Sequence, residues 1–246
     1  MKKILLLFVV ALMFSCNSKS QESPNSNADA QPQDSDTKVT LLFIGDMMQH
    51  QGQINAARQL DGSYVYHCFD KVKPIIESAD IAIANLEVTH AGPPFKGYPR
   101  FCAPDAYLYA IRDAGVDVLL TANNHWCDTG KKGLERTITL LDSLKIPHLG
   151  TYKNAAERER TYTLIVEKNG IKIALLNYTY GTNGIPTPQG NVVNLDTDRE
   201  QMKKDIAKAK SMNPDVIIAN MHWGVEYVLL PNSQQKELAQ WLLDQG

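Results

Sequence analysis

Short apolar runs alternate with longer amphipathic stretches along most of the chain. Five runs rich in β-branched and aliphatic residues are typical of buried strands in a parallel sheet, at residues 39–44, 81–84, 116–120, 171–176 and 216–219. Five stretches with apolar residues three to four positions apart predict helices, at residues 69–78, 104–114, 133–144, 199–211 and 233–244. An extended stretch at residues 162–166 precedes Lys168-Asn169-Gly170, which predicts a hairpin turn into the next strand. Alternating strands and helices predict an α/β fold, a layered sandwich with a mainly parallel central sheet flanked by helices.

Polar side chains follow every predicted parallel strand. The segments are G-D-M-M at 45–48, N-L-E at 85–87, T-A-N-N-H-W-C-D-T-G at 121–130, N-Y-T-Y-G-T-N at 177–183 and N-M-H-W-G-V-E at 220–226. In open α/β sheets, ligands bind outside the carboxyl ends of the strands. We therefore expect these five segments to converge on one crevice.

The donors in these segments are Asp, Glu, Asn and His, without a cysteine cluster. Oxygen atoms mixed with imidazole suit a divalent metal such as Mn, Fe, Zn or Mg. Asp46 is expected to bind or bridge an ion, and Asn124 to offer a carbonyl oxygen. His125 and His222 are candidate ligands or general acids and bases, and Asp128 is placed to orient His125. The alternative is that each residue only caps a strand or forms a turn.

Composition and charge narrow the function classes. The chain has 246 residues, of which 43% are apolar and 21% charged, as in ordinary globular proteins. A formal net charge of −2 provides no basic surface for nucleic acid, so we expect no nucleic-acid partner. If Cys16 is lipidated, Cys68, Cys102 and Cys127 remain, and these three form at most one disulfide. Without C-x-x-C spacing, each is interpreted as a small buried residue rather than a ligand or nucleophile.

The N-terminus is predicted to be a targeting segment. Lys2 and Lys3 precede a ten-residue apolar core at residues 4–13, which is too short to span a bilayer. Phe14-Ser15-Cys16 resembles the lipobox of bacterial lipoproteins, with an ordinary secretory signal as the alternative. We predict a signal peptide at 1–15, a polar flexible tether at 16–37 and a domain at 38–246. The domain is then outside the cytoplasm, held at a membrane of the cell envelope by a lipid on Cys16.

Four motifs together resemble a known family. G-D-M-M at 45–48, N-L-E at 85–87, A-N-N-H-x-x-D-x-G at 122–130 and H-W-G-x-E-Y at 222–227 are similar, in this order, to the bacterial capsule biosynthesis CapA family. That family is linked to poly-γ-glutamate synthesis and export, and its fold is like that of calcineurin-type metallophosphatases. The resemblance implies metal or catalytic positions at Asp46, Asn124, His125 and His222. Substrate-binding roles are assigned to further residues of these motifs: Asn85, Glu87, Asn123, Trp223 and Glu226. For Trp223, packing around the site is the alternative.

The sequence departs from the metallophosphatase pattern at two places. Met48 occupies the position where metallophosphatases usually carry a histidine, which is also typical of the CapA type. In the family a further strand with a G-x-H-P-H type motif normally follows residues such as 241–246. We therefore expect the last strand of the fold, and its ligands, to be missing from this sequence.

Two functional hypotheses follow from these patterns. The first is a membrane-anchored, metal-dependent hydrolase or transferase that acts on an amide or phosphoester of an envelope polymer. The second is a non-catalytic subunit that binds the polymer or assembles with other capsule-synthesis proteins. The loop at residues 92–101 contains two cations and three aromatic residues, and it is interpreted either as a contact for an anionic polymer or as a rigid surface loop.

Overall fold

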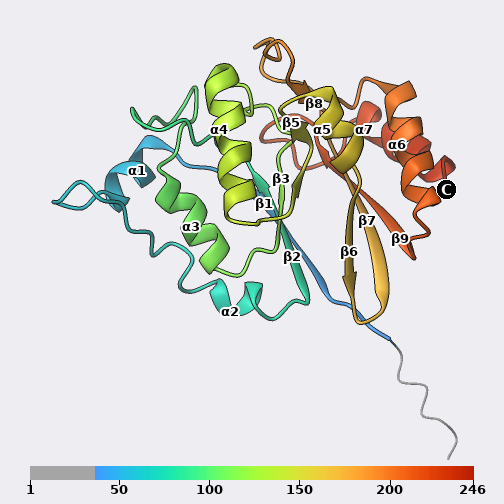
Figure 1. Cartoon of the computed structure of the whole chain (residues 1–246), viewed down its shortest axis with the longest axis horizontal. Helices are drawn as coiled ribbons and strands as arrows, with labels where there is room; N and C mark the ends of the chain where they lie inside the picture. Colours follow the sequence, from blue (N-terminus) through green and yellow to red (C-terminus); the bar gives the residue numbers. More distant parts are fainter. Residues whose placement is uncertain (1–36) are drawn as a thin grey trace, which may run out of the picture. The chain divides into compact units, whose positions relative to one another are not determined.

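The computed structural model describes residues 37–246, so the predicted signal peptide, tether and Cys16 lie outside the described residues. Four strands form a parallel sheet in the order β1-β2-β3-β4 (Figure 1). Their bounds are Leu41–Met47 for β1, Ile81–Leu86 for β2, Val118–Leu120 for β3 and His148–Leu149 for β4. Three of the five predicted parallel strands, those at residues 39–44, 81–84 and 116–120, lie in this sheet, and β4 was not among those five.

A second sheet contains the later strands, in the order β6-β7-β9. Their bounds are Leu164–Lys168 for β6, Ile171–Thr179 for β7 and Val216–His222 for β9. β6 and β7 form the predicted antiparallel hairpin, with positive φ angles of 52° at Asn169 and 77° at Gly170 in its turn. β7 pairs in parallel with β9. The division of the strands between two sheets was not predicted. A two-stranded ribbon joins β5 (Thr151–Tyr152) and β8 (Val192–Val193).

Side-chain alternation along the central strands builds three apolar layers. In β2, Ala82 and Ala84 point into a core shared with helices, whereas Ile81 and Ile83 point into a second core. That second core also contains Ile173 of β7, so the two sheets pack face to face. Residues of β7 with the opposite orientation join a third core. The period of two in strand side chains thus explains a helix–sheet–sheet–helix order.

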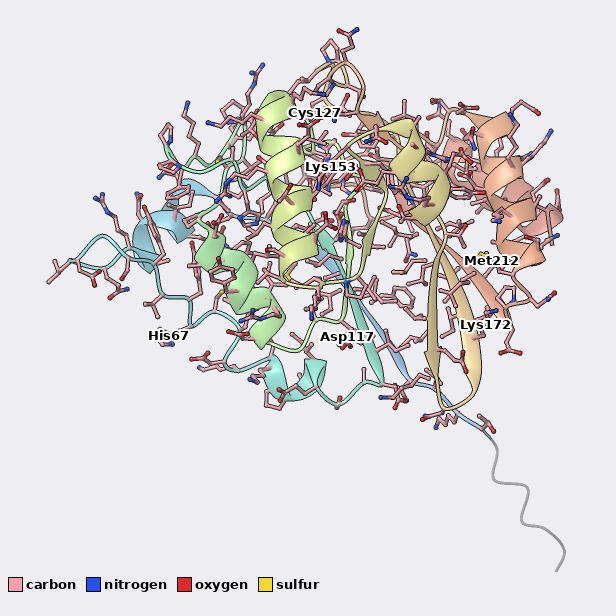
Figure 2. The ribbon with its side chains drawn as sticks, viewed as in Figure 1. His67, Asp117, Cys127, Lys153, Lys172 and Met212 are labelled. Carbon is pink, nitrogen blue, oxygen red and sulfur yellow. The ribbon has the colours of Figure 1, made fainter. Side chains whose placement is uncertain are left out.

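Seven helices are present among residues 37–246. They are α1 (Gln51–Ala57), α2 (Lys73–Ile76), α3 (Asp105–Asp113), α4 (Gly130–Ser143), α5 (Ala155–Thr161), α6 (Arg199–Ser211) and α7 (Ser233–Asp244). α3 and α4 cover the first sheet, and α6 and α7 cover the second. Within the described part of the chain, no helix is long and apolar enough to cross a membrane. The charged side chain of Lys172 on β7 reaches Met212 beside it (Figure 2) and donates to the Met212 carbonyl, which ties the end of α6 to the sheet.

Some predictions of burial are wrong. β1 and β9 each lie at the end of a sheet in the described part of the chain, so Phe43 is 48% and Val216 41% exposed. Cys102 and Cys127 are buried as predicted, but Cys68 is exposed, because it belongs to the irregular segment before α2. All three cysteines are free among the residues that the structure describes.

Candidate functional site

The carboxyl ends of β1, β2 and β9 bring three ligand-type side chains together. Asp46 lies near the end of β1, Glu87 directly follows β2, and His222 ends β9. A bulge between Ile44 and Asp46 shifts the register of β1, so that Asp46 pairs with Asn85 of β2. Because a bulge re-aims the side chain beside it, the sequence Gly45-Asp46 turns a carboxylate toward the neighbouring strand end.

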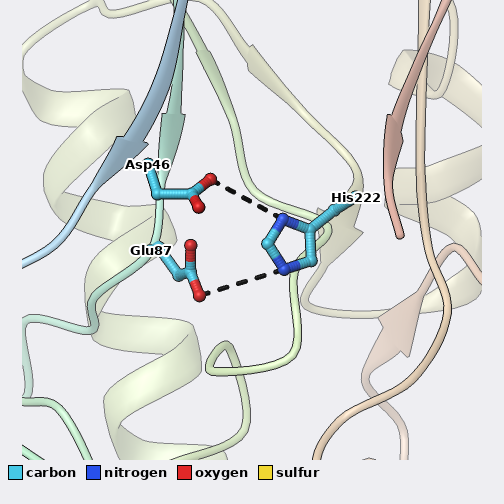
Figure 3. A group of neighbouring side chains, drawn as sticks. All are labelled: Asp46, Glu87 and His222. Atoms are coloured by element: carbon cyan, nitrogen blue, oxygen red, sulfur yellow. Dashed lines mark ion pairs between the residues drawn. The ribbon is translucent and has the colours of Figure 1, made fainter. Parts of the chain in front are cut away.

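These three residues have the geometry of a cation site. One ligand atom from each of Asp46, Glu87 and His222 lies within 4.8 Å of the others. In Figure 3 both carboxylates face the imidazole ring, with 3.7 Å from Asp46 Oδ1 to Nδ1 and 3.9 Å from Glu87 Oε1 to Nε2. The Asn85 amide lies between them, because its Nδ2 donates to Asp46 Oδ1 at 2.8 Å and to Glu87 Oε2 at 3.3 Å.

Carboxyl groups are crowded together in this cluster. Burial raises the pKa of Glu87, and together with the nearby carboxylates of Asp46 and Glu226 it brings this pKa to about 9. Burial lowers the pKa of His222, and the nearby Asp46 carboxylate opposes that shift. A divalent cation at this position would stabilise the ionised form of the carboxylates and could take the neutral imidazole as a ligand. The donor set therefore fits a divalent metal ion.

A second histidine is held by a carboxylate behind it. Asp128 Oδ2 lies 2.8 Å from His125 Nδ1, and it also accepts a hydrogen bond of 2.6 Å from the Phe101 backbone amide. Both His125 and Asp128 are buried. An ionised carboxylate only accepts hydrogen bonds, so Nδ1 of His125 carries the proton and Nε2 is left as the acceptor. The sequence prediction that Asp128 orients His125 agrees with this geometry.

A row of amides connects the two histidines. The Asn183 amide nitrogen lies 3.4 Å from His125 Nε2, and its oxygen accepts a hydrogen bond of 3.1 Å from Asn124. The Asn124 oxygen in turn lies 2.8 Å from His222 Nε2. Since an amide oxygen only accepts, Nε2 of His222 carries the proton, and Nδ1 accepts from the Asn85 amide nitrogen 3.2 Å away. Asn124, predicted as a metal ligand, here orients an imidazole.

Two further asparagines hold the segment that follows β3. Asn123 donates to the Asn85 side chain at 3.1 Å, and its own oxygen accepts from the His125 backbone amide. Asn177 of β7 accepts from the backbone amides of Thr121 and Ala122, at 3.1 and 2.8 Å. Buried asparagines at these strand ends therefore fix the backbone that carries His125.

The side chains line an open cleft of about 430 Å³. Asp46, Glu87, Asn124, His125, His222, Trp223 and Glu226 line it, whereas the predicted residues Asn85, Asn123 and Asp128 lie behind its wall. Three carboxylates line the cleft, and no lysine or arginine does so among residues 37–246. A positive charge at the cluster would have to come from a ligand rather than from a side chain of residues 37–246.

Sequence reasoning did not assign Tyr180, Asn183 or His50 to the site. Tyr180 stacks on His222 with ring centres 6.0 Å apart, and Asn183 contacts His125. Both belong to the polar segment that follows β7, which was the available signal. His50 also lines the cleft. From the loop at residues 92–101, Tyr98 and Phe101 reach the cleft.

The sequence model of the bacterial capsule synthesis protein PGA_cap family matches residues 40–246. The chain belongs to this family. Capsule biosynthesis protein CapA of Bacillus anthracis is 28% identical to it over 220 residues, which make up 85% of this chain and 52% of that protein. PGA biosynthesis protein CapA of Bacillus subtilis (strain 168) is 27% identical over 224 residues, 86% of this chain and 56% of that protein. The chain thus spans about half the length of the curated relatives it matches.

The fold of this family member also has a counterpart among solved structures. The "Putative 5'-Nucleotidase from Staphylococcus aureus" superposes with a TM-score of 0.50 at 14% sequence identity, over 83% of this chain and 43% of that one. At this identity the likeness concerns the fold alone. The predicted metallophosphatase-like layered fold and the predicted CapA resemblance are both confirmed.

Proposed function

We propose that this chain acts in the synthesis or export of a capsule-type anionic polymer, of the poly-γ-glutamate kind, and carries a metal-dependent hydrolase-type site. Membership of the capsule synthesis family and the names of its two Bacillus relatives support the polymer assignment. Those names also support a location in the cell envelope. Anchoring through a lipid on Cys16 is part of the proposal and agrees with the lipobox-like residues at 14–16.

One observation carries the metal site: three carboxylates and His222 meet in a cleft whose described walls contain no cationic side chain. Asp46, Glu87 and His222 Nδ1 would hold the ion. Oxygen and imidazole donors favour Mn, Fe, Zn or Mg over a thiolate-seeking metal. When bound, such an ion polarises an amide or phosphoester and lowers the pKa of a bound water.

His125 is assigned the proton transfer. Asp128 holds the Nδ1 proton, so Nε2 accepts a proton from a water or returns one to a leaving group. Asn183 keeps Nε2 directed toward the cleft, and Phe101 limits rotation of the ring by edge contact at 4.6 Å between ring centres. Asn124 performs the same orienting role for His222.

Metal analysis of the purified full chain tests the site. Wild-type protein is expected to retain a divalent ion after dialysis, and His222→Ala and Glu87→Gln are expected to lose it or to bind it at least about tenfold more weakly. His67→Ala is the matched control, because His67, labelled in Figure 2, is an exposed histidine. Its only ion pair in the described residues is with Asp70. Wild-type protein that is folded but binds neither Mn²⁺, Zn²⁺ nor Mg²⁺ refutes the metal site.

Turnover separates catalysis from polymer binding alone. The aromatic wall of the cleft, with Tyr98, Phe101, Tyr180 and Trp223, favours polymer binding as the second candidate function. With a γ-linked glutamate polymer as probe, an enzyme releases new amine ends, and His125→Ala is expected to reduce their release by at least about a hundredfold while retaining its fold. Binding of the polymer without release of amine ends in wild-type protein would support the non-catalytic subunit instead.

A further inference from the structure

A second cavity adjoins the cleft. It also has a volume of about 430 Å³, and it shares Tyr180, Trp223, Gly224 and Val225 with the cleft. Its other walls come from the segment before α6 and from the first turns of α6 and α7. Because the two cavities share these walls, one extended ligand can occupy both at once.

The second cavity contains an arginine, Arg199, with one nitrogen that is unpaired among the described residues. Burial raises the pKa of the nearby Asp196, and the charge of Arg199 opposes that shift. Arg199 is the first residue of α6, and its guanidinium carbon lies 4.8 Å from the centre of the Trp241 ring. Its Nη1 atom is buried and has no hydrogen-bond partner, and no carboxylate among residues 37–246 forms an ion pair with it. Because a buried charged donor without an acceptor is unfavourable, this arginine is poised to bind an acceptor from a ligand.

The backbone around Arg199 favours an anion in the same place. α6 and α7 have 13 and 12 residues, and the first turns of both border this cavity. Helix N-termini carry partial positive charge that adds to that of the guanidinium, although the Asp198 carboxylate already caps α6 and the Asn232 side chain caps α7. Arginine binds carboxylates with two parallel N–H donors, which a lysine cannot do.

Two acidic side chains in the same cavity restrict the ligand further. Asp196 and Glu237 line it without pairing with Arg199. Ionised carboxylates only accept hydrogen bonds, so the ligand has to present donors to them and an anionic group to the arginine. An amide-linked polymer of carboxylated units offers both, because each unit has an N–H group and a carboxylate.

We propose that this cavity is a second subsite for the polymer, in which Arg199 binds the carboxylate of the unit next to the one in the cleft. Amide N–H groups of the polymer then face Asp196 and Glu237. The inference rests on the proposed function, because it takes the polymer class from there. It also explains how a cleft lined by three carboxylates can receive an anionic chain: the ion neutralises the cleft, and Arg199 holds the neighbouring unit.

Binding of γ-linked glutamate oligomers to the full chain with Mn²⁺ tests the subsite. In calorimetric titrations, we expect wild-type protein to bind a longer oligomer about tenfold more tightly than the dimer. Arg199→Gln should remove this advantage and leave binding of the dimer unchanged, and Arg199→Lys should lose part of it. Lys203→Gln removes the same charge from an exposed position of α6, where Lys203 pairs with Glu200, and should bind like wild type.

The outcomes separate the subsite from the proposed function. If Arg199→Gln keeps its melting temperature and still binds the longer oligomer as tightly as wild type, the subsite is overturned but the proposed function is not. Failure of wild-type protein to bind either oligomer overturns the polymer class and the subsite with it. Tighter binding of an oligogalacturonate, whose units carry carboxylates without amides, overturns the amide-linked ligand.

Discussion

Acid should destabilise the protein through one buried imidazole, that of His90. This residue follows β2 and is completely buried, and neither ring nitrogen has a hydrogen-bond partner among residues 37–246. Burial lowers the pKa of His90 from 6.5 to about 4, and Arg136 adds to this effect while Asp105 opposes it. The folded protein therefore keeps His90 neutral at pH values where the unfolded chain protonates it.

The sign and size of the effect follow from this pKa difference. Above pH 6.5 the imidazole is neutral in both states, and stability is unaffected. As the pH falls toward 4, the unfolded chain binds a proton that the folded protein does not, so the free energy of unfolding decreases. The difference between 6.5 and about 4 corresponds to about 3 kcal/mol when the fall is complete.

Urea unfolding followed by circular dichroism measures this loss. Between about pH 7 and about pH 4.5, the free energy of unfolding of His90→Leu should fall by about 2 kcal/mol less than that of the wild type. His67→Leu replaces an exposed histidine, and its free energy of unfolding should fall with pH as steeply as that of the wild type. The carboxylates that titrate in this range are the same in all three proteins, so their contribution cancels in the comparison. An equally steep loss in His90→Leu and wild type would refute the reasoning.

Two other predictions concern residues that support the site. Asp205 is buried and pairs with Arg158 at 2.6 Å. In urea titrations, Asp205→Asn should therefore lower the free energy of unfolding by about 3 to 5 kcal/mol. A loss below about 1 kcal/mol would contradict the stabilising role of this buried ion pair. A Cβ atom on Gly150 would lie 2.2 Å from Asn177 Oδ1, at a φ of 117°, so Gly150→Ala should cost about 3 kcal/mol and weaken metal binding through the segment after β3. Gly184→Ala has a φ of 71° and open space around it, so its cost should be only about 1 kcal/mol with metal binding retained.

Helices with an apolar stripe were predictable from the sequence. α6 and α7 have the predicted bounds, and α3 differs from its prediction by one residue at each end. α5 was not predicted, because its one buried residue is Arg158, which is held by Asp205 on α6 rather than by an apolar face. The short helix α1 was not predicted, and α2 occupies only four residues of the helix predicted at 69–78. Helices this short depend on tertiary contacts more than on their own sequence pattern.

The convergence of the strand ends was predictable, but the grouping within the cleft was not. Parallel strands place their carboxyl ends at one edge, and this brought Asp46, His125 and His222 into one cleft. The sequence does not reveal that a bulge in β1 pairs Asp46 with Asn85. Nor does it reveal that the Glu87 carboxylate lies 3.9 Å from the His222 ring. These details depend on register and packing between two sheets, which no single segment encodes.

The side chains of this site are oriented by uncharged amides rather than by cations, and this affects its chemistry. Asn85, Asn123, Asn124 and Asn183 orient the carboxylates and imidazoles, whereas no arginine or lysine lines the cleft in the described part of the chain. Amides fix geometry without neutralising charge, so the negative charge of the cluster stays available to a cation. A paired arginine would stabilise the empty cluster and weaken its attraction for an ion. Because an ion that binds only the folded chain stabilises it, metal binding at this cluster would be coupled to folding.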